Sequence, residues 1–174
     1  MIKLNIGSRE RAEGWKTLDI DPGPEVDYVG DCGDLVAFKD NSIDTIYASH
    51  VLEHVSYHED MQTTLKEWFR VLLPGGTVMI SVPDFETLCR LFLHKELSGE
   101  ERFHVMRIIF GGQVDPYDFH SVGLTWEFLG SYLNDVGFQN IERVDDFQLF
   151  QDSSVLKFGN IAISLNVKAQ KPAP

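Results

Sequence analysis

The sequence predicts an α/β domain built on a mostly parallel sheet. Apolar runs typical of strands alternate with segments of helical periodicity along most of the chain, which is the pattern of a parallel sheet covered by helices. The length of 174 residues suits one domain, and 43% hydrophobic residues suffice for a packed core. We therefore expect residues 1–174 to form a single domain with a seven-stranded sheet and helices on both faces.

Strands are expected wherever short apolar runs end at turn residues. The first five expected strands are residues 2–6, 17–20, 26–29, 43–48 and 77–82. A final pair, residues 139–144 and 161–168, is expected to be antiparallel at one edge of the sheet.

Two helices have clear start and stop signals. Ser56 and Glu59 have the spacing of a capping box, and Pro74-Gly75-Gly76 provides a stop. Between them, apolar residues recur at helical spacing, at Met61, Leu65, Trp68, Phe69 and Leu72. A later helix is expected from about Thr125 to Gly137.

The segment from about residue 84 to residue 120 has no regular periodicity. Asp84 has the position of an N-cap for a first helix that carries Leu88, Leu91 and Phe92. A second helix is expected from about residue 100 to residue 110. The loop that follows, residues 113–120, is rich in acidic and aromatic residues. We interpret residues 84–120 as an insertion that covers the functional site.

Composition limits the function classes. With 27 acidic and 15 basic residues, the formal net charge is −12, which disfavours nucleic acid as a partner. Cys32 and Cys89 are far apart in sequence, so a reducing, cytoplasmic compartment is expected. No signal peptide and no bilayer-spanning run is expected, so we predict no membrane association.

The first two expected strands end in residues suited to a nucleoside. Gly7 closes the first strand, and a glycine turn lets a ligand approach the backbone closely. Asp19 ends the second strand, where a carboxylate can accept hydrogen bonds from both hydroxyls of a ribose. Asp21 is the alternative acid, although it also suits a turn before Pro22.

These segments, together with Leu52-Glu53-His54 and Pro74-Gly75-Gly76, resemble the class I S-adenosylmethionine-dependent methyltransferases. The likeness is to small predicted bacterial methyltransferases of type 11. It is good from Leu4 to about Asp84 and looser as far as Val167. The resemblance implies a Rossmann-like class I methyltransferase fold and S-adenosylmethionine as cofactor.

The resemblance also implies a set of cofactor-binding residues. Asp19 would bind the ribose, Asp31 and Cys32 the adenine, and His50 the methionine end. The whole expected set is Asn5, Gly7, Ser8, Asp19, Ile20, Asp31, Cys32, Ser49 and His50. One departure is Arg9, which stands where most of these enzymes have a second glycine; its side chain either points outward or contacts the cofactor carboxylate.

His50-Val51-Leu52-Glu53-His54 also matches the H-x-x-E-H pattern of inverted zinc peptidases. That pattern needs both histidines on one helical face, whereas a strand is expected to end just before His50. We therefore expect no metal site.

Methyl transfer to a hydroxyl usually needs a base. His120 is the first candidate for the catalytic base and Asp84 the second; His120 is equally suited to a structural or exposed role, and Asp84 to a helix cap. Tyr117, Phe119 and Trp126 either form a lid over a small acceptor or pack a loop.

We thus predict methyl transfer to a small-molecule acceptor, such as a sugar or a saccharide precursor. The alternative is a non-catalytic or regulatory protein that binds S-adenosylmethionine. A nicotinamide-dependent oxidoreductase is a weaker alternative, because the longer glycine fingerprint is missing. The sequence predicts neither the acceptor nor the oligomeric state.

Overall fold

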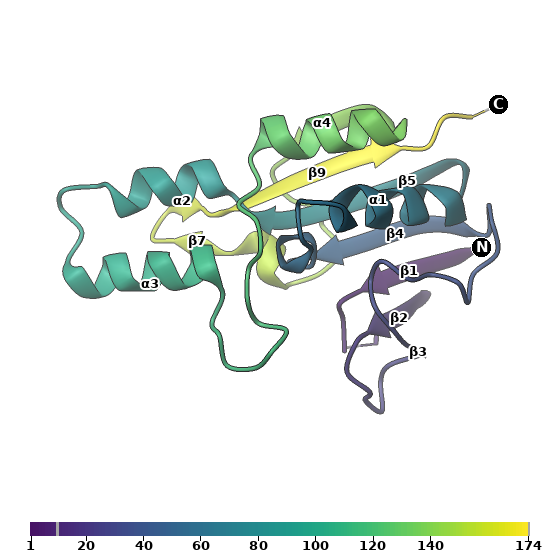
Figure 1. Cartoon of the computed structure of the whole chain (residues 1–174), viewed down its shortest axis with the longest axis horizontal. Helices are drawn as coiled ribbons and strands as arrows, with labels where there is room; N and C mark the ends of the chain where they lie inside the picture. Colours follow the sequence, from purple (N-terminus) through teal and green to yellow (C-terminus); the bar gives the residue numbers. More distant parts are fainter. Residues whose placement is uncertain (10, 174) are drawn as a thin grey trace.

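The computed structural model describes residues 1–9 and 11–173, which form a seven-stranded sheet with helices (Figure 1). The strand order is β3-β2-β1-β4-β5-β9-β6, and β9 alone runs antiparallel to its neighbours. This confirms the predicted seven-stranded, mostly parallel sheet. Its strands are β1 (Ile2–Ile6), β2 (Trp15–Asp19), β3 (Tyr28–Val29), β4 (Ile43–Ser49), β5 (Leu72–Pro83), β6 (Gln139–Val144) and β9 (Ser164–Gln170).

The last predicted strand is divided in two. Its first part, β8 (Ile161–Ala162), pairs with β7 (Lys157–Phe158) in a separate hairpin, and β9 then joins the main sheet. The break falls at Ile163, whose amide donates to the carbonyl of Leu156 and whose carbonyl accepts from Asp84. The amide of Ile163 thus continues the pairing with the β7 strand, and its carbonyl continues the pairing with β5, so the pairing partner changes at this residue.

Helix α1 (Asp60–Val71) has different ends from those predicted. Glu59 occupies the N-cap and makes no side-chain capping bond, so the capping box expected from Ser56 is absent. Leu72 takes an extended conformation and is buried, so the chain passes directly from α1 into β5. The helix therefore ends before Pro74-Gly75-Gly76, which lies within β5.

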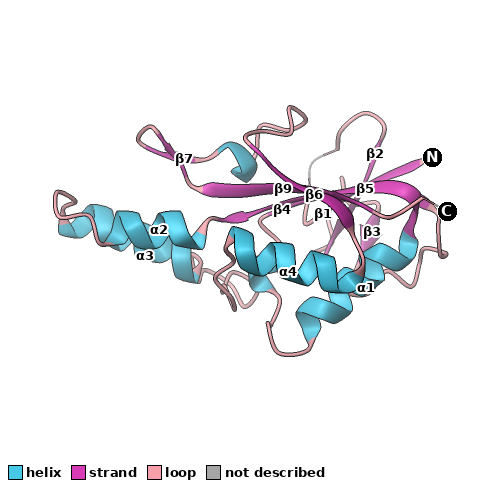
Figure 2. Cartoon of the chain, turned by 90° about the horizontal axis from the view of Figure 1, so that it is seen from above, coloured by secondary structure: helices cyan, strands magenta, loops and turns pink. Residues whose placement is uncertain are grey.

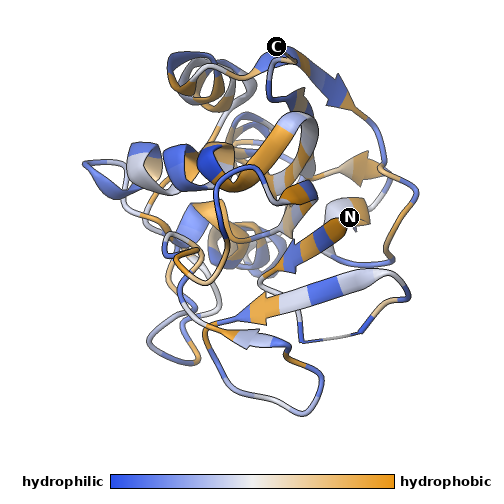
Figure 3. Cartoon of the chain, turned by 90° about the vertical axis from the view of Figure 1, so that its right-hand side faces the viewer, coloured by the Kyte–Doolittle hydropathy of each residue, from blue (hydrophilic) through white to orange (hydrophobic). Residues whose placement is uncertain are grey.

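Helix α4 (Trp126–Val136) lies beside α1 on the same face of the sheet (Figure 2). Alternate strand residues such as Ile46 and Ala48 join the apolar core beneath these helices. Figure 3 shows this alternation of polar and apolar residues along β1. Helices α1 and α4 thus cover the same face of the sheet.

A loop with aromatic residues packs against the opposite face. Tyr47 points to that face and contacts the rings of Trp15, Phe147 and Phe150. The Tyr47 hydroxyl donates a 2.8 Å hydrogen bond to Asp152. The described parts of connections 7–14 and 20–27 contain no helix, so the segment around residues 145–155 takes the covering role.

Helices α2 (Phe85–Phe92) and α3 (Gly99–Phe110) extend away from the sheet as a pair (Figure 1). Asp84 caps α2, as predicted, and a capping box formed by Ser98 and Glu101 begins α3. Their small core contains Leu88, Leu91, Val105 and Ile163. None of the described helices is long and apolar enough to cross a membrane.

Candidate functional site

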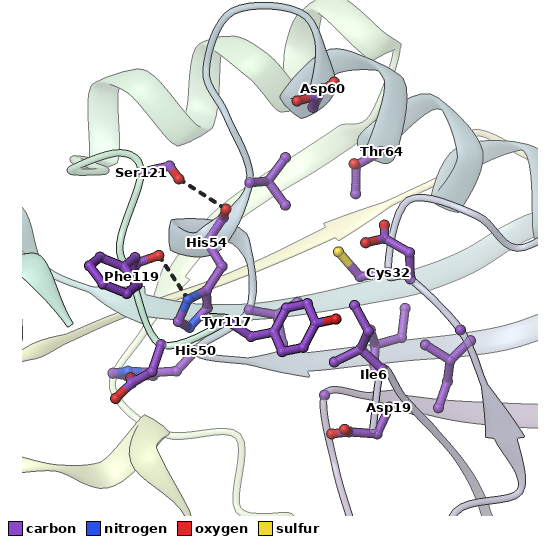
Figure 4. A pocket seen from close by; sticks show the side chains of 18 of the residues that line it. Ile6, Asp19, Cys32, His50, His54, Asp60, Thr64, Tyr117, Phe119 and Ser121 are labelled. Carbon is purple, nitrogen blue, oxygen red and sulfur yellow. Dashed lines mark hydrogen bonds between the residues drawn. The ribbon is translucent and has the colours of Figure 1, made fainter. Parts of the chain in front are cut away.

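A pocket of about 600 Å³ lies at the carboxyl ends of the parallel strands. This edge is where open α/β sheets bind ligands, and the volume lies within the roughly 300–1,000 Å³ of typical small-molecule sites. Its lining comes from the ends of β1, β2 and β4, the loop after β3, the start of α1 and the segment 115–121. Figure 4 shows Asp19, Cys32, His50 and Tyr117 around this space.

The turn after β1 requires glycine. Gly7 has φ +75°, and a Cβ there would collide with Cγ2 of Val51. Its amide donates a 2.7 Å hydrogen bond to the carbonyl of Leu18 on β2. The backbone of Gly7 is therefore held at the pocket edge, with no side chain between it and a ligand.

Arg9 turns toward the end of β2. Its Nη2 lies 2.6 Å from Oδ2 of Asp21, and its Nε lies 3.3 Å from Oδ1 of Asp19. Asp19 also accepts a 2.9 Å hydrogen bond from the amide of Asp21. The Arg9 side chain is 60% exposed, so it lies across the mouth of the pocket at the Asp19 side.

Two hydrogen bonds hold the loop after β3 in place, one within the loop and one from α1. Asp31 accepts a 2.7 Å hydrogen bond from the amide of Gly33, which closes the turn. The indole nitrogen of Trp68, on α1, donates a 2.7 Å hydrogen bond to the carbonyl of Cys32. Burial raises the pKa of the Cys32 thiol to about 12, and the charge of Asp31 acts in the same direction.

His50 follows β4 in a strained backbone conformation. Its φ is 55°, in the left-handed region that non-glycine residues rarely adopt. One ring nitrogen, Nε2, lies 3.0 Å from the hydroxyl oxygen of Ser164, and the other, Nδ1, lies 3.3 Å from Oε1 of Glu53. The ring is thus fixed between β9 and the short helix η1 (Leu52–His54).

Glu53 lies among three histidines, His50, His54 and His120, and the four residues form what we call the histidine cluster. His50 and His54 of this cluster also line the pocket. Glu53 is 1% exposed, and neither carboxylate oxygen has a hydrogen-bond partner among the described residues. Nε2 of His120 lies 4.0 Å from its Oε1, and the rings of His54 and His120 meet edge to face at 4.8 Å. Glu53, His54 and His120 each offer an atom that can bind a metal, all within 4.8 Å of one another.

Backbone hydrogen bonds explain how His120 reaches Glu53. The amides of Ser121 and Val122 both donate to the carbonyl of Glu53, at 2.7 and 3.3 Å. At the other end of the loop, Gly111 has φ +84°, and a Cβ there would collide with the carbonyl of Asp118. The loop after α3 therefore folds back tightly and brings the ring of His120 into contact with the ring of His54.

Burial sets the protonation of this cluster. It raises the pKa of Glu53 to about 8. It lowers the pKa of His50 to about 4, and the neighbouring His120 contributes to that decrease. Burial also lowers the pKa of His120, with a contribution from His54. All three shifts favour the neutral forms, because a buried charge without a partner is costly.

The pocket lining includes six of the nine expected cofactor residues. Gly7, Asp19, Ile20, Asp31, Cys32 and His50 line it, whereas Asn5, Ser8 and Ser49 do not. Tyr117 and Phe119 are also part of the lining, and Trp126 is not.

Neither of the two candidate catalytic residues lines the pocket. His120 lies behind His54 and belongs to the buried cluster. Asp84 is 4% exposed; its carboxylate caps α2 through Thr87 and lies 2.8 Å from Nη2 of Arg143. The structure shows Asp84 as a helix cap and ion-pair partner, which is the alternative role given to it above; its catalytic role stays a prediction.

Glu53 and His54 were not among the expected cofactor or catalytic residues. Their signal in the sequence is the H-x-x-E-H pattern, which we set aside because a strand ends before His50. The strand does end at Ser49, and His50 lies outside η1, so no continuous helix carries both histidines. The cluster forms nonetheless, because His120 joins it from a distant segment.

The strand order and the pocket at the strand ends define an α/β fold of Rossmann type with a cavity of small-molecule size. Residues 7–80 match the sequence model of a family described as "Methyltransferase domain". The ubiquinone/menaquinone biosynthesis C-methyltransferase UbiE of Cronobacter sakazakii is 29% identical over 126 residues, which are 67% of this chain and 47% of that protein. The chain therefore spans about half the length of this relative.

Solved structures of similar fold include two described as S-adenosylmethionine-dependent methyltransferases. That from Archaeoglobus fulgidus has a TM-score of 0.61 at 17% identity, covering 97% of this chain and 85% of its own. That from Methanosarcina mazei has a TM-score of 0.60 at 17% identity, covering 99% and 92%. The chain is thus similar in sequence, over residues 7–80, to the methyltransferase domain family, and similar in fold to S-adenosylmethionine-dependent methyltransferases.

Proposed function

We propose that the chain binds S-adenosylmethionine in this pocket and transfers the methyl group to a small-molecule acceptor. One observation carries the proposal: Gly7, Asp19, Cys32 and His50, from the ends of four separate strands or their loops, line the same pocket. These are residue types suited to a nucleoside with a charged amino-acid end.

The residues present fit the parts of the cofactor. Asp19 would accept hydrogen bonds from the ribose hydroxyls, and the loop at Asp31 and Cys32 would hold the adenine. The bare backbone at Gly7 leaves room for the methionine end, between β1 and His50. When bound, S-adenosylmethionine supplies a methyl group on a sulfonium, which is activated for displacement.

We place the acceptor on the side of the pocket lined by His54, Tyr117 and Phe119. The polar lining there includes Asp115 and Ser121, which suits a hydroxyl-bearing molecule such as a sugar or a saccharide precursor. The net charge of −12 argues against a nucleic acid. His120 does not line the pocket, so in this proposal it acts on the acceptor through its neighbours in the cluster.

The alternative is a protein that binds the cofactor without methyl transfer. The observation that favours it is the pairing of Arg9 with Asp19, since the ribose would compete for the same carboxylate. Turnover of any acceptor would rule this alternative out. In either case, the free cysteines Cys32 and Cys89 support a reducing compartment, and we propose the cytoplasm.

Calorimetric titration with S-adenosylhomocysteine tests cofactor binding. We expect one site per chain in the wild type and an affinity about 10- to 100-fold lower in Asp19→Asn, the scale of losing hydrogen bonds to a charged group. Asp44→Asn is the matched control, because Asp44 lies near the opposite end of β4. Equal affinity in the Asp19 variant, or no binding by the wild type, would contradict the proposal.

A further inference from the structure

The buried carboxylate of Glu53 needs a cation or a proton. Both of its oxygens lack hydrogen-bond partners among the described residues, and the side chain is 2% exposed. Burying a carboxylate without compensation is very costly, so such a group is typically paired, protonated or bound to a metal. No arginine or lysine of the described residues forms an ion pair with it; the basic side chains with a nitrogen within 4.0 Å of its carboxylate are His50 and His120.

Hydrogen bonds fix the protonation of the His50 ring. The hydroxyl of Ser164 donates its only hydrogen to the carbonyl of Ser153, at 2.7 Å. It must therefore accept from Nε2 of His50, which carries the ring hydrogen. The lone pair of Nδ1 consequently faces Oε1 of Glu53 at 3.3 Å.

His54 is oriented in a similar way. Its Nδ1 lies 3.1 Å from the carbonyl oxygen of Phe119, as the dashed line in Figure 4 shows, so Nδ1 carries the hydrogen and Nε2 the lone pair. Metal-binding histidines usually have one ring nitrogen fixed by such a partner while the other binds the ion. His50 and His54 both meet this condition before any ion is bound.

We propose that His50, Glu53, His54 and His120 bind a divalent transition-metal ion. Imidazole and carboxylate groups together suit zinc, cobalt and related ions. Metal–ligand distances of roughly 2.0–2.2 Å place the ligands of a tetrahedral ion about 3.3 Å apart. Nδ1 of His50 and Oε1 of Glu53 are 3.3 Å apart, and the ligand atoms of Glu53, His54 and His120 lie within 4.8 Å of one another. The side chains of His54 and His120 would move closer to Glu53 when an ion binds.

The ion would lie next to the cofactor pocket, because His50 and His54 belong to its lining. Four protein ligands fill a tetrahedral ion, so an acceptor oxygen would bind as a fifth ligand or in place of one of the four side chains. Bound in this way, its hydroxyl would have a lowered pKa. This role rests on the proposed methyl transfer, whereas the metal site itself does not.

Cobalt is the first probe, because Co²⁺ bound by such ligands absorbs visible light. We expect chelator-treated protein to bind one Co²⁺ per chain, with a visible spectrum that Zn²⁺ abolishes. Glu53→Gln and His54→Ala should each weaken binding at least tenfold. The matched control is His94→Ala, which removes an exposed histidine outside the cluster. Absence of the spectrum, or equal affinity in all variants, would overturn the proposal.

A measurement on the wild type covers the case of variants that do not fold. Carbethoxylation by diethyl pyrocarbonate, mapped by mass spectrometry, should be slowed by Zn²⁺ at His54 and not at His58 or His94. Equal reaction of His54 with and without Zn²⁺ would also overturn the proposal. Calorimetry with S-adenosylhomocysteine on zinc-free and zinc-loaded protein reads cofactor binding separately, so failure of one proposal is distinguishable from failure of the other.

Discussion

The indole of Trp68 is fully buried, and its Nε1 donates a 2.7 Å hydrogen bond to the carbonyl of Cys32. The bond joins α1, on one face of the sheet, to the loop after β3 that lines the pocket. The same side chain belongs to the main apolar core. Packing of α1 and the position of the expected adenine loop therefore depend on one residue.

Trp68→Phe should weaken both folding and cofactor binding. The change leaves the Cys32 carbonyl without its donor, which costs about 1–3 kcal/mol of unfolding free energy for a buried group. We also expect several-fold weaker binding of S-adenosylhomocysteine. Urea unfolding and calorimetry measure the two effects, and Trp126→Phe, at a half-exposed position, is the control. A loss of stability with unchanged affinity would show that this bond does not position the loop.

Arg9→Ala should change the affinity for S-adenosylhomocysteine by less than about fivefold. The Arg9 side chain is 60% exposed, and exposed ion pairs contribute about 0–1 kcal/mol. Its removal leaves Asp19 free to bind the ribose, so any change should be toward tighter binding. Calorimetry at low and moderate salt measures the effect. A large loss of affinity would instead assign Arg9 a direct contact with the cofactor.

The sequence predicted best those elements whose signals are local. Residues 2–6 and 139–144 are strands with the predicted bounds, because each run ends at a turn signal. The capping box at Ser56 was wrong, because the chain there continues through a turn and α1 begins later, at Asp60. On the face to which Tyr47 points, side chains from a distant loop pack against the sheet, and no local signal in the sequence indicates this contact.

The histidine cluster shows why part of the site was not predicted. The spacing of His50, Glu53 and His54 is visible in the sequence, but His120 comes 66 residues after His54, through a loop held by the carbonyl of Glu53. The hydrophobic periodicity of a sequence does not indicate that a distant loop folds back to contact these residues. The strand-end residues Gly7 and Asp19 were predictable, because parallel strands bring their carboxyl ends to one edge.

Cys32 should react slowly with thiol reagents in the folded protein. Burial raises its pKa from the ordinary 9.0 to about 12, so the thiolate that reacts is scarce at neutral pH. S-adenosylhomocysteine should slow the reaction further, because Cys32 lines the pocket. Iodoacetamide labelling of the Cys89→Ser variant, native and unfolded, measures this rate. Equally fast labelling in both states would contradict the prediction.

Asp27→Asn should lower stability at neutral pH and have little effect in acid. The carboxylate of Asp27 accepts hydrogen bonds from Lys16, at 2.8 Å, and from the amide of Thr17, at 3.0 Å. The Lys16 bond, followed by that of Thr17, lowers the pKa of Asp27 from 3.8 to about 2. Because the folded pKa lies below the unfolded value, the stabilisation is complete above pH 4 and is lost as the pH falls toward 2.

The measurement is the urea midpoint of the wild type and of Asp27→Asn at several pH values between 7 and 3. The difference between the two proteins should be largest at pH 7 and should shrink below pH 4, because the Asp27 carboxylate of the unfolded wild type then takes up a proton while that of the folded state does so only near pH 2. Asp34→Asn is the charge-matched control, since Asp34 lies in an exposed loop and accepts only from the amide of Val36 among the described hydrogen bonds. A difference that stays constant down to pH 3 would mean that Asp27 acts through hydrogen bonds that its protonated form keeps, and not through its charge.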